Sequence, residues 1–166
     1  MLSDKYFIEM NRINLEKKKS KVEAKIRGDA FELVMYNLLK PKYKNLIDNN
    51  IKSKWSVMDF TDNTAKLEIE CKNREGNKHN DFDGDCDTNG LCFGRNKYYF
   101  GCDRIKQGYK FIVYFNCSNG IFYWELTNPE KQKDEYTFGM GGNKKIGQRP
   151  TELIYIKTKY LQKFQQ

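Results

Sequence analysis

The chain has 166 residues, of which 39% are hydrophobic and 31% charged, and this size and composition predict one globular domain over residues 1–166. It has no apolar run of the roughly 20 residues that a membrane-spanning helix needs, and its first residues lack the features of a secretory signal. We therefore expect an intracellular protein, cytoplasmic or nuclear, that is not secreted and has no membrane partner. The net charge of +8 favours a polyanion as partner, with nucleic acid ahead of an anionic membrane surface.

The cysteines and the single histidine limit the chemistry further. Five cysteines are an odd number, they are irregularly spaced, and they do not predict a disulfide framework. No C-x-x-C pair is present, and His79 is poorly placed to complete a zinc site. Zinc binding and histidine-based catalysis are therefore disfavoured.

The first predicted element is a helix over residues 18–39. Its apolar residues recur mostly at steps of three and four, as on one face of a helix, and the helix should end before Pro41. A short strand is predicted at residues 45–47. The apolar positions of the helix are Val22, Ile26, Ala30, Phe31, Leu33, Val34 and Leu38.

Two strands are predicted next, and each carries an acidic residue. Asp59 ends the first apolar run and Glu70 lies near the end of the second, with a polar turn at residues 61–64 between them. Because side chains two positions apart in a strand share a face, Glu70 and Lys72 should project to one side, with Glu68 beside them as a bystander. A hairpin would bring Asp59 next to Glu70. The alternate residues of the second strand should face the core: Leu67, Ile69 and Cys71.

The rest of the chain alternates polar stretches with apolar strands. Residues 73–96 predict a long irregular loop, and a short helix is expected around residues 98–107. A buried strand at 110–117 and its hairpin partner at 121–126 follow. A polar loop over residues 139–149 and a last strand at 153–161 complete the chain. The order of elements predicts an α/β or α+β domain with a mixed sheet.

The residues around Asp59 and Glu70 resemble the signature of the PD-(D/E)XK nuclease superfamily. The likeness consists of Met58-Asp59, an interval of eleven residues, and then Glu70-Cys71-Lys72 on the next strand. Upstream, the segment from Arg27 to Glu32, RGDAFE, resembles the glycine-to-glutamate segment on the first helix of Holliday-junction resolvases. The resemblance implies a restriction-endonuclease-like core, in which helices flank a central mixed sheet.

The resemblance also implies a metal-dependent endonuclease that hydrolyses DNA phosphodiester bonds, with structure-selective cutting favoured slightly. Mg²⁺ prefers oxygen ligands and keeps several waters, so Asp59, Glu70 and the carbonyl of Cys71 can hold it, and Mn²⁺ can substitute. Lys72 would orient the attacking water or stabilise charge on the phosphate. Glu32, if family-like, would reach the metal directly or through water. A resolvase would act as a homodimer, because symmetric cutting of two strands needs two sites.

Two other interpretations remain open at the level of sequence. Glu-x-Lys in a strand with one face in water is uninformative by itself, so the chain could be a catalytically inactive nucleic-acid-binding domain of the same fold. Alternatively, it could be a calcium-ordered interaction module, because Asp85, Asp87, Asn89 and Gly90 match the start of a calcium loop. Asn96 departs from that pattern, since a bidentate Glu is expected at its position.

Cations and aromatics near the predicted short helix are candidates for nucleic-acid contact, with DNA favoured over RNA. The cations would contact phosphates and Tyr98 would stack on bases. Ordinary surface charge, with Tyr98 and Phe100 in the core, is the alternative. A basic loop containing Lys144 is a further candidate for backbone contact. The full set of candidate nucleic-acid-binding residues is Arg74, Arg95, Lys97, Tyr98 and Lys144.

Overall fold

The computed structural model describes residues 4–53, 56–75, 90–141 and 151–165, with only the backbone described for residues 4–17 and Lys52. A six-stranded sheet has the strand order β1-β2-β3-β5-β6-β9, and a three-stranded sheet has the order β4-β8-β7. In chain order the elements are α1 (Asp4–Leu39), β1 (Ile47–Asp48), α2 (Asn49–Lys52), β2 (Phe60–Asp62), β3 (Leu67–Asn73), β4 (Leu91–Gly94), α3 (Arg95–Lys106), β5 (Lys110–Cys117), β6 (Gly120–Leu126), η1 (Lys133–Glu135), β7 (Tyr136–Gly141), β8 (Thr151–Ile156), η3 (Thr158–Tyr160) and β9 (Gln162–Lys163).

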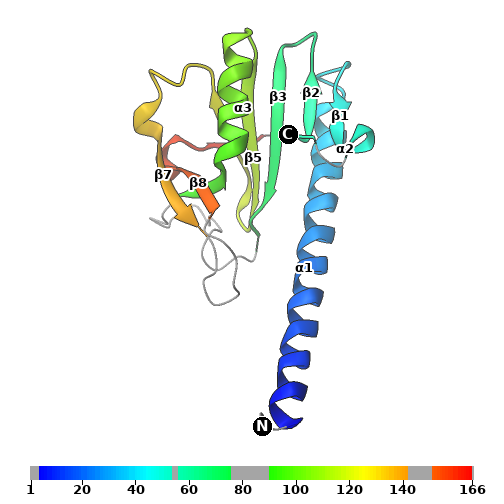
Figure 1. The fold of residues 1–166 in the computed structure, drawn as a ribbon. Helices are drawn as coiled ribbons and strands as arrows, with labels where there is room; N and C mark the ends of the chain where they lie inside the picture. The colour runs from blue at the N-terminus through cyan, green and yellow to red at the C-terminus, as the bar shows by residue number, and fades with distance from the viewer. Residues whose placement is uncertain (1–3, 54–55, 76–89, 142–150, 166) are drawn as a thin grey trace.

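The larger sheet is mixed, because β3 and β5 run parallel while its other neighbouring strands run antiparallel. Parallel neighbours cannot be joined by a tight turn and need a crossover connection, in which α3 is the helix (Figure 1). The prediction of a mixed α/β fold with a mixed sheet flanked by helices is therefore confirmed at that level of detail.

Helices α1 and α3 cover opposite faces of the larger sheet, as alternate residues of β5 show. Ile112 and Tyr114 belong to a core that also contains Phe31 and Met35 of α1. The intervening residues of β5 belong to a second core, which is formed with α3, β6 and the smaller sheet: Phe111, Val113 and Phe115. Burial on both faces explains why the sequence of β5 is a nearly continuous apolar run.

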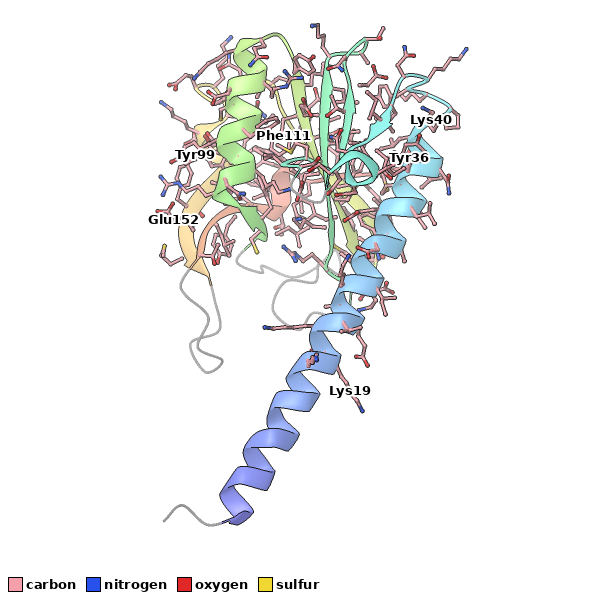
Figure 2. All side chains as sticks on the ribbon, turned by 45° about the vertical axis from the view of Figure 1, so that its right-hand side comes forward. Lys19, Tyr36, Lys40, Tyr99, Phe111 and Glu152 are labelled. Atoms are coloured by element: carbon pink, nitrogen blue, oxygen red, sulfur yellow. The ribbon has the colours of Figure 1, made fainter. Side chains whose placement is uncertain are left out.

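Gly101 lets α3 approach the sheet closely. This glycine is buried, and a Cβ atom added to it would lie 2.5 Å from Cδ1 of Phe111 on β5. Figure 2 shows Phe111 beside α3. A side chain at this position would therefore push α3 away from β5 and β3.

The helix α1 is longer than predicted, and of the seven apolar positions assigned to its buried face only Phe31 and Leu38 pack against the core. It begins at Asp4 and ends at Leu39, so the predicted end before Pro41 is confirmed. The residues that contact the sheet are spaced by four: Phe31, Met35 and Leu39. Most of the apolar residues that we assigned to the buried face are exposed, because the sheet covers only the side of α1 on which Phe31, Met35 and Leu39 lie, and α1 extends beyond the sheet toward its N-terminus (Figure 1). The exposed apolar residues are Val22, Ile26, Leu33 and Val34.

Three other sequence-based predictions need correction. The predicted loop at residues 73–96 begins with the last residue of β3, and its end contains β4 and the start of α3. The strand β4 forms because it pairs with β8. The predicted loop at 139–149 begins inside β7. The predicted strand at 153–161 is divided into β8 and the 3-10 helix η3, and β9 follows at residues 162–163.

Other elements agree with the sequence. The strand predicted at 110–117 matches β5, and its hairpin partner matches β6 to within one residue. The strand predicted at 45–47 is the two-residue β1, one position later. Among the helices in the described residues, none combines the length and apolar character needed to cross a membrane.

Candidate active site

Asp59 lies immediately before β2 and is held in place by three hydrogen bonds, two of them with β3 and one with Asn49 of α2. Its backbone N–H donates to the carbonyl of Ile69, and its own carbonyl accepts from the N–H of Asn49. Its side chain is 8% exposed, and Oδ2 accepts the backbone N–H of Cys71 at 2.7 Å. These bonds fix the carboxylate at the point where the pairing of β2 with β3 stops.

Cys71 presents its backbone to this same point. The N–H and C=O of one strand residue point to the same side of the strand, and the N–H of Cys71 points at Asp59. The carbonyl of Cys71 therefore lies on the side of β3 that faces Asp59. This is the arrangement that the predicted third oxygen ligand requires, whereas the Cys71 thiol is in the core beneath α1.

Glu70 projects to the other face of β3, and two ammonium groups contact it. Its side chain is fully buried. Nζ of Lys72 forms an ion pair with Oε1, and Nζ of Lys97 lies 2.9 Å from Oε2. Neither Glu70 oxygen accepts a well-directed hydrogen bond from any described residue, so the carboxylate is paired by charge but has unused acceptor capacity.

The pKa values of these groups reflect burial and mutual charge. Burial raises the pKa of Glu70, Lys72 opposes this rise, and Asp59 adds to it. Burial lowers the pKa of Lys72, but the Glu70 carboxylate more than offsets that effect, so the net shift is upward. Lys72 therefore remains an ammonium ion at neutral pH, and its side chain is still 28% exposed.

Lys97 reaches the site from α3. Its ammonium group contacts Glu70 and also donates to the carbonyl of Val57, and its side chain is 19% exposed. We predicted Lys97 as a nucleic-acid contact, but the structure places it against the candidate catalytic carboxylate. The sequence feature that could have indicated an inward position for Lys97 is its spacing with Gly101 and Arg104. Positions i, i+4 and i+7 share one face of a helix, and here that face meets β3.

Glu68, which we expected to be a bystander beside Glu70, is buried. Its side chain is 2% exposed, Oε1 lies 2.6 Å from Nε of Arg104, and Oε2 accepts from the hydroxyl of Thr61 at 2.6 Å. The Arg104 guanidinium also lies 3.6 Å from the ring centroid of Tyr109. Both faces of β3 are therefore covered, and Glu68 has its own partners away from Glu70.

Glu32 approaches from α1 through a cavity. This cavity of about 600 Å³ lies between α1 and the β1–α2 segment. Nδ2 of Asn50 donates to Oε2 of Glu32 at 3.0 Å. Burial, followed by the charges of Asp59 and Asp29, raises the pKa of Glu32 to about 7. The cavity is lined by Lys25, Asp29, Glu32, Leu33, Asp48 and Asn50.

Of the other predicted nucleic-acid contacts, one is buried, two are engaged with other parts of the protein, and one lies outside the described residues. Tyr98 is buried and its hydroxyl lies 2.5 Å from that of Tyr136, so stacking of this ring on a base is excluded and the core alternative holds. Arg95 pairs with Glu152, and its guanidinium lies over the exposed ring of Tyr99. Arg74 donates to the carbonyl of Cys92. Lys144 and the proposed calcium loop at residues 85–89 lie outside the described residues.

The described residues offer two carboxylates, those of Asp59 and Glu70, as ligands for a hard divalent cation. Among the described residues, no group of three or more His, Cys, Asp or Glu side chains is arranged to hold a metal ion. Asp59 and Glu70 together with the Cys71 carbonyl nevertheless supply the number of protein oxygens that Mg²⁺ commonly uses, because waters and substrate phosphate complete its shell. The unused acceptor capacity of Glu70 supports this fit. Glu32 lies close enough to Asp59 and Glu70 for their charges to raise its pKa, which is consistent with an assisting role.

Comparison of the chain with protein-family models, with curated proteins and with solved structures finds no match. A functional proposal for this chain therefore depends on its own side chains and their arrangement.

Proposed function

We propose that this protein is a metal-dependent endonuclease that hydrolyses DNA phosphodiester bonds, with a core like that of the PD-(D/E)XK nucleases. The observation that carries the proposal is that Glu70 contacts the ammonium groups of Lys72 and Lys97, while Asp59 accepts the N–H of the next residue, Cys71, and its charge acts on Glu70. Burying a carboxylate with two ammonium groups costs free energy because the charges lose their contact with water. Buried charged groups of this kind are common in catalytic sites.

The chemistry assigns a separate role to each side chain. Asp59 and Glu70 would hold Mg²⁺, with the Cys71 carbonyl as third protein ligand. Bound Mg²⁺, or Mn²⁺ in its place, supplies an activated water nucleophile and neutralises charge on the phosphate. Lys72 orients the nucleophile and stabilises negative charge on the phosphate, since its side chain is more exposed than that of Lys97. Lys97, tied to Val57, keeps the Glu70 carboxylate in position.

The net charge of +8 supports a nucleic-acid substrate. Structure-selective cutting and a homodimer are part of the same proposal, and both derive from the resemblance of the segment from Arg27 to Glu32 to junction resolvases. Gly28 and Glu32 of that segment both lie on α1, and Glu32 lines the cavity and is close enough to Asp59 for its charge to raise the pKa of Glu32.

A second candidate function is a nucleic-acid-binding domain of this fold without catalytic activity. It is favoured by one observation: both Glu70 oxygens are already paired with lysine ammonium groups, so the charge of Glu70 is balanced without a metal. In this case the cluster would stabilise the junction of β3 with α3, and divalent cations would have no effect on the protein.

The test is a cleavage panel of duplex, flap, four-way junction and single-stranded DNA, with matched RNA, in Mg²⁺, Mn²⁺ or chelator. We expect metal-dependent cutting of at least one DNA substrate. Cutting that persists in chelator would exclude this mechanism. DNA binding without any cutting, by protein whose melting temperature does not respond to Mg²⁺, would support the inactive binding domain instead.

A further inference from the structure

The middle of α1 carries a row of lysines that leads toward Glu32. Lys18, Lys21 and Lys25 are exposed, and they are spaced by three and four residues, so they lie along one face of the helix. Seven residues after Lys25 comes Glu32, and a step of seven changes the direction of a side chain by only about 20°. The row therefore continues the helix face on which Glu32 lines the cavity.

The charge along this row is largely uncompensated. Lys25 pairs with Asp29 at 2.7 Å, but no described acidic side chain pairs with Lys18 or Lys21. Val22 is one turn from Lys18, so the exposed apolar residues Val22 and Ile26 border the row on one side. Figure 2 shows that the part of α1 before Lys19 projects away from the sheets, whereas Lys25 at the other end of the row lines the cavity together with Asp48 and Asn50.

We propose that Lys18, Lys21 and Lys25 bind consecutive phosphates of a DNA strand and align it with the cavity that contains Glu32. At 1.5 Å per residue the row is about 10 Å long. Successive nucleotides of one strand are separated by about 3.4 Å along the duplex axis, so the row covers about three of them. This inference rests on the proposed function only in naming DNA as the substrate, and it concerns binding rather than cutting.

The test compares two double variants of the whole protein that remove equal charge from the same helix. Lys18→Gln/Lys21→Gln removes two members of the row, whereas Lys19→Gln/Arg27→Gln removes two exposed cations from other faces of α1. Binding to a fluorescent 20-base-pair duplex is measured in chelator from 0.05 to 0.2 M salt, with circular dichroism as the check on folding. A parallel titration uses vesicles that contain phosphatidylserine.

For the row variant we expect the slope of log affinity against log salt to flatten by about 1.8 and affinity to fall severalfold at low salt, because two phosphate contacts are lost. The control variant should change the slope by less than half as much. Equal effects of the two variants, no effect of either, or wild-type binding to vesicles but not to duplex would each overturn the proposal. Because chelator prevents cutting, failure of the proposed nuclease activity would leave this measurement unaffected.

Discussion

Lys97 on α3 and Glu70 on β3 are in direct contact, with 2.9 Å between Nζ and Oε2, although 27 positions separate them in the sequence. The contact joins the crossover helix to the central strand of the candidate site. Because Glu70 is fully buried, its charge depends on this ammonium and on that of Lys72.

Replacing Lys97 should therefore destabilise the protein in a pH-dependent way. We expect Lys97→Met to lower the free energy of unfolding by about 1–3 kcal/mol at pH 8, because the Glu70 carboxylate loses one of its two partners. The loss should shrink near pH 4, where a protonated Glu70 needs no cation. Urea denaturation at both pH values measures this. The exposed Lys106 on the same helix provides the control variant, Lys106→Met, which should have little effect. An equal loss of stability for Lys97→Met at both pH values would contradict the pairing of Lys97 with a charged Glu70.

Removing the charge of Glu32 should have the opposite effect on stability. The pKa of Glu32 is raised to about 7 in the folded protein, so its protonation favours folding at acid pH and this contribution is lost as the pH rises through 7. In chelator, Glu32→Gln should therefore be more stable than the wild type at pH 8, by about 1 kcal/mol after allowance for solvent screening. The gain should vanish by pH 4. A stability difference that does not change with pH would contradict the raised pKa.

Two buried aspartates at either end of β2 allow a matched test of catalysis. Asp59→Asn keeps an oxygen that can accept the Cys71 N–H, so we expect the fold to persist while Mg²⁺-dependent cutting falls by at least about a thousandfold. Asp62→Asn changes a residue that accepts the N–H groups of Thr64 and Ala65 in a turn, and it should leave cutting by the folded protein unchanged. Equal rates for Asp59→Asn and the wild type would remove Asp59 from the site.

Glu68 should matter for folding rather than for chemistry. Its partners are Arg104 and Thr61, and we expect Glu68→Gln to lower the free energy of unfolding by about 1–3 kcal/mol because one of its charge-assisted contacts is lost. Cutting by folded Glu68→Gln should stay within about threefold of the wild type. Denaturation and cleavage assays on one preparation separate the two effects, and Glu70→Gln, which should abolish cutting, is the companion variant.

Mg²⁺ itself should stabilise the folded protein. A ligand that binds only the folded state at 100 times its dissociation constant adds about 2.7 kcal/mol to the free energy of unfolding. We expect the melting temperature to rise with Mg²⁺ for the wild type, with little change for Asp59→Asn. A rise of equal size in both proteins would place the cation elsewhere.

The sequence predicted correctly the elements that have a clear local signal. The strand β5 is buried on both faces and is correspondingly apolar, and α1 ends before Pro41 because proline cannot continue the helix. The strand β7 was missed because Gly139 and Gly141 are typical of loops. Both glycines instead make room for β8, since a Cβ at Gly139 would lie 2.8 Å from Cε2 of Tyr155.

The candidate site could be predicted only along one strand. Alternation in β3 places Glu70 and Lys72 on one face without any tertiary information. Lys97 could not be assigned to that site, because its contact depends on how closely α3 approaches the sheet at Gly101. The exposed position of Val22 and Ile26 was equally hidden, since helical spacing reveals an apolar face but not how far the sheet beneath it extends.

The larger sheet ends on both sides in strands of only two residues, β1 and β9. Such short ends leave few backbone N–H and C=O groups open to another chain, and natural proteins use short edge strands to resist edge-to-edge aggregation. If two copies associate, strand-to-strand extension of this sheet is therefore a poor route. A two-fold interface formed elsewhere on the protein would leave the central strands of this sheet and their carboxylates undisturbed by assembly.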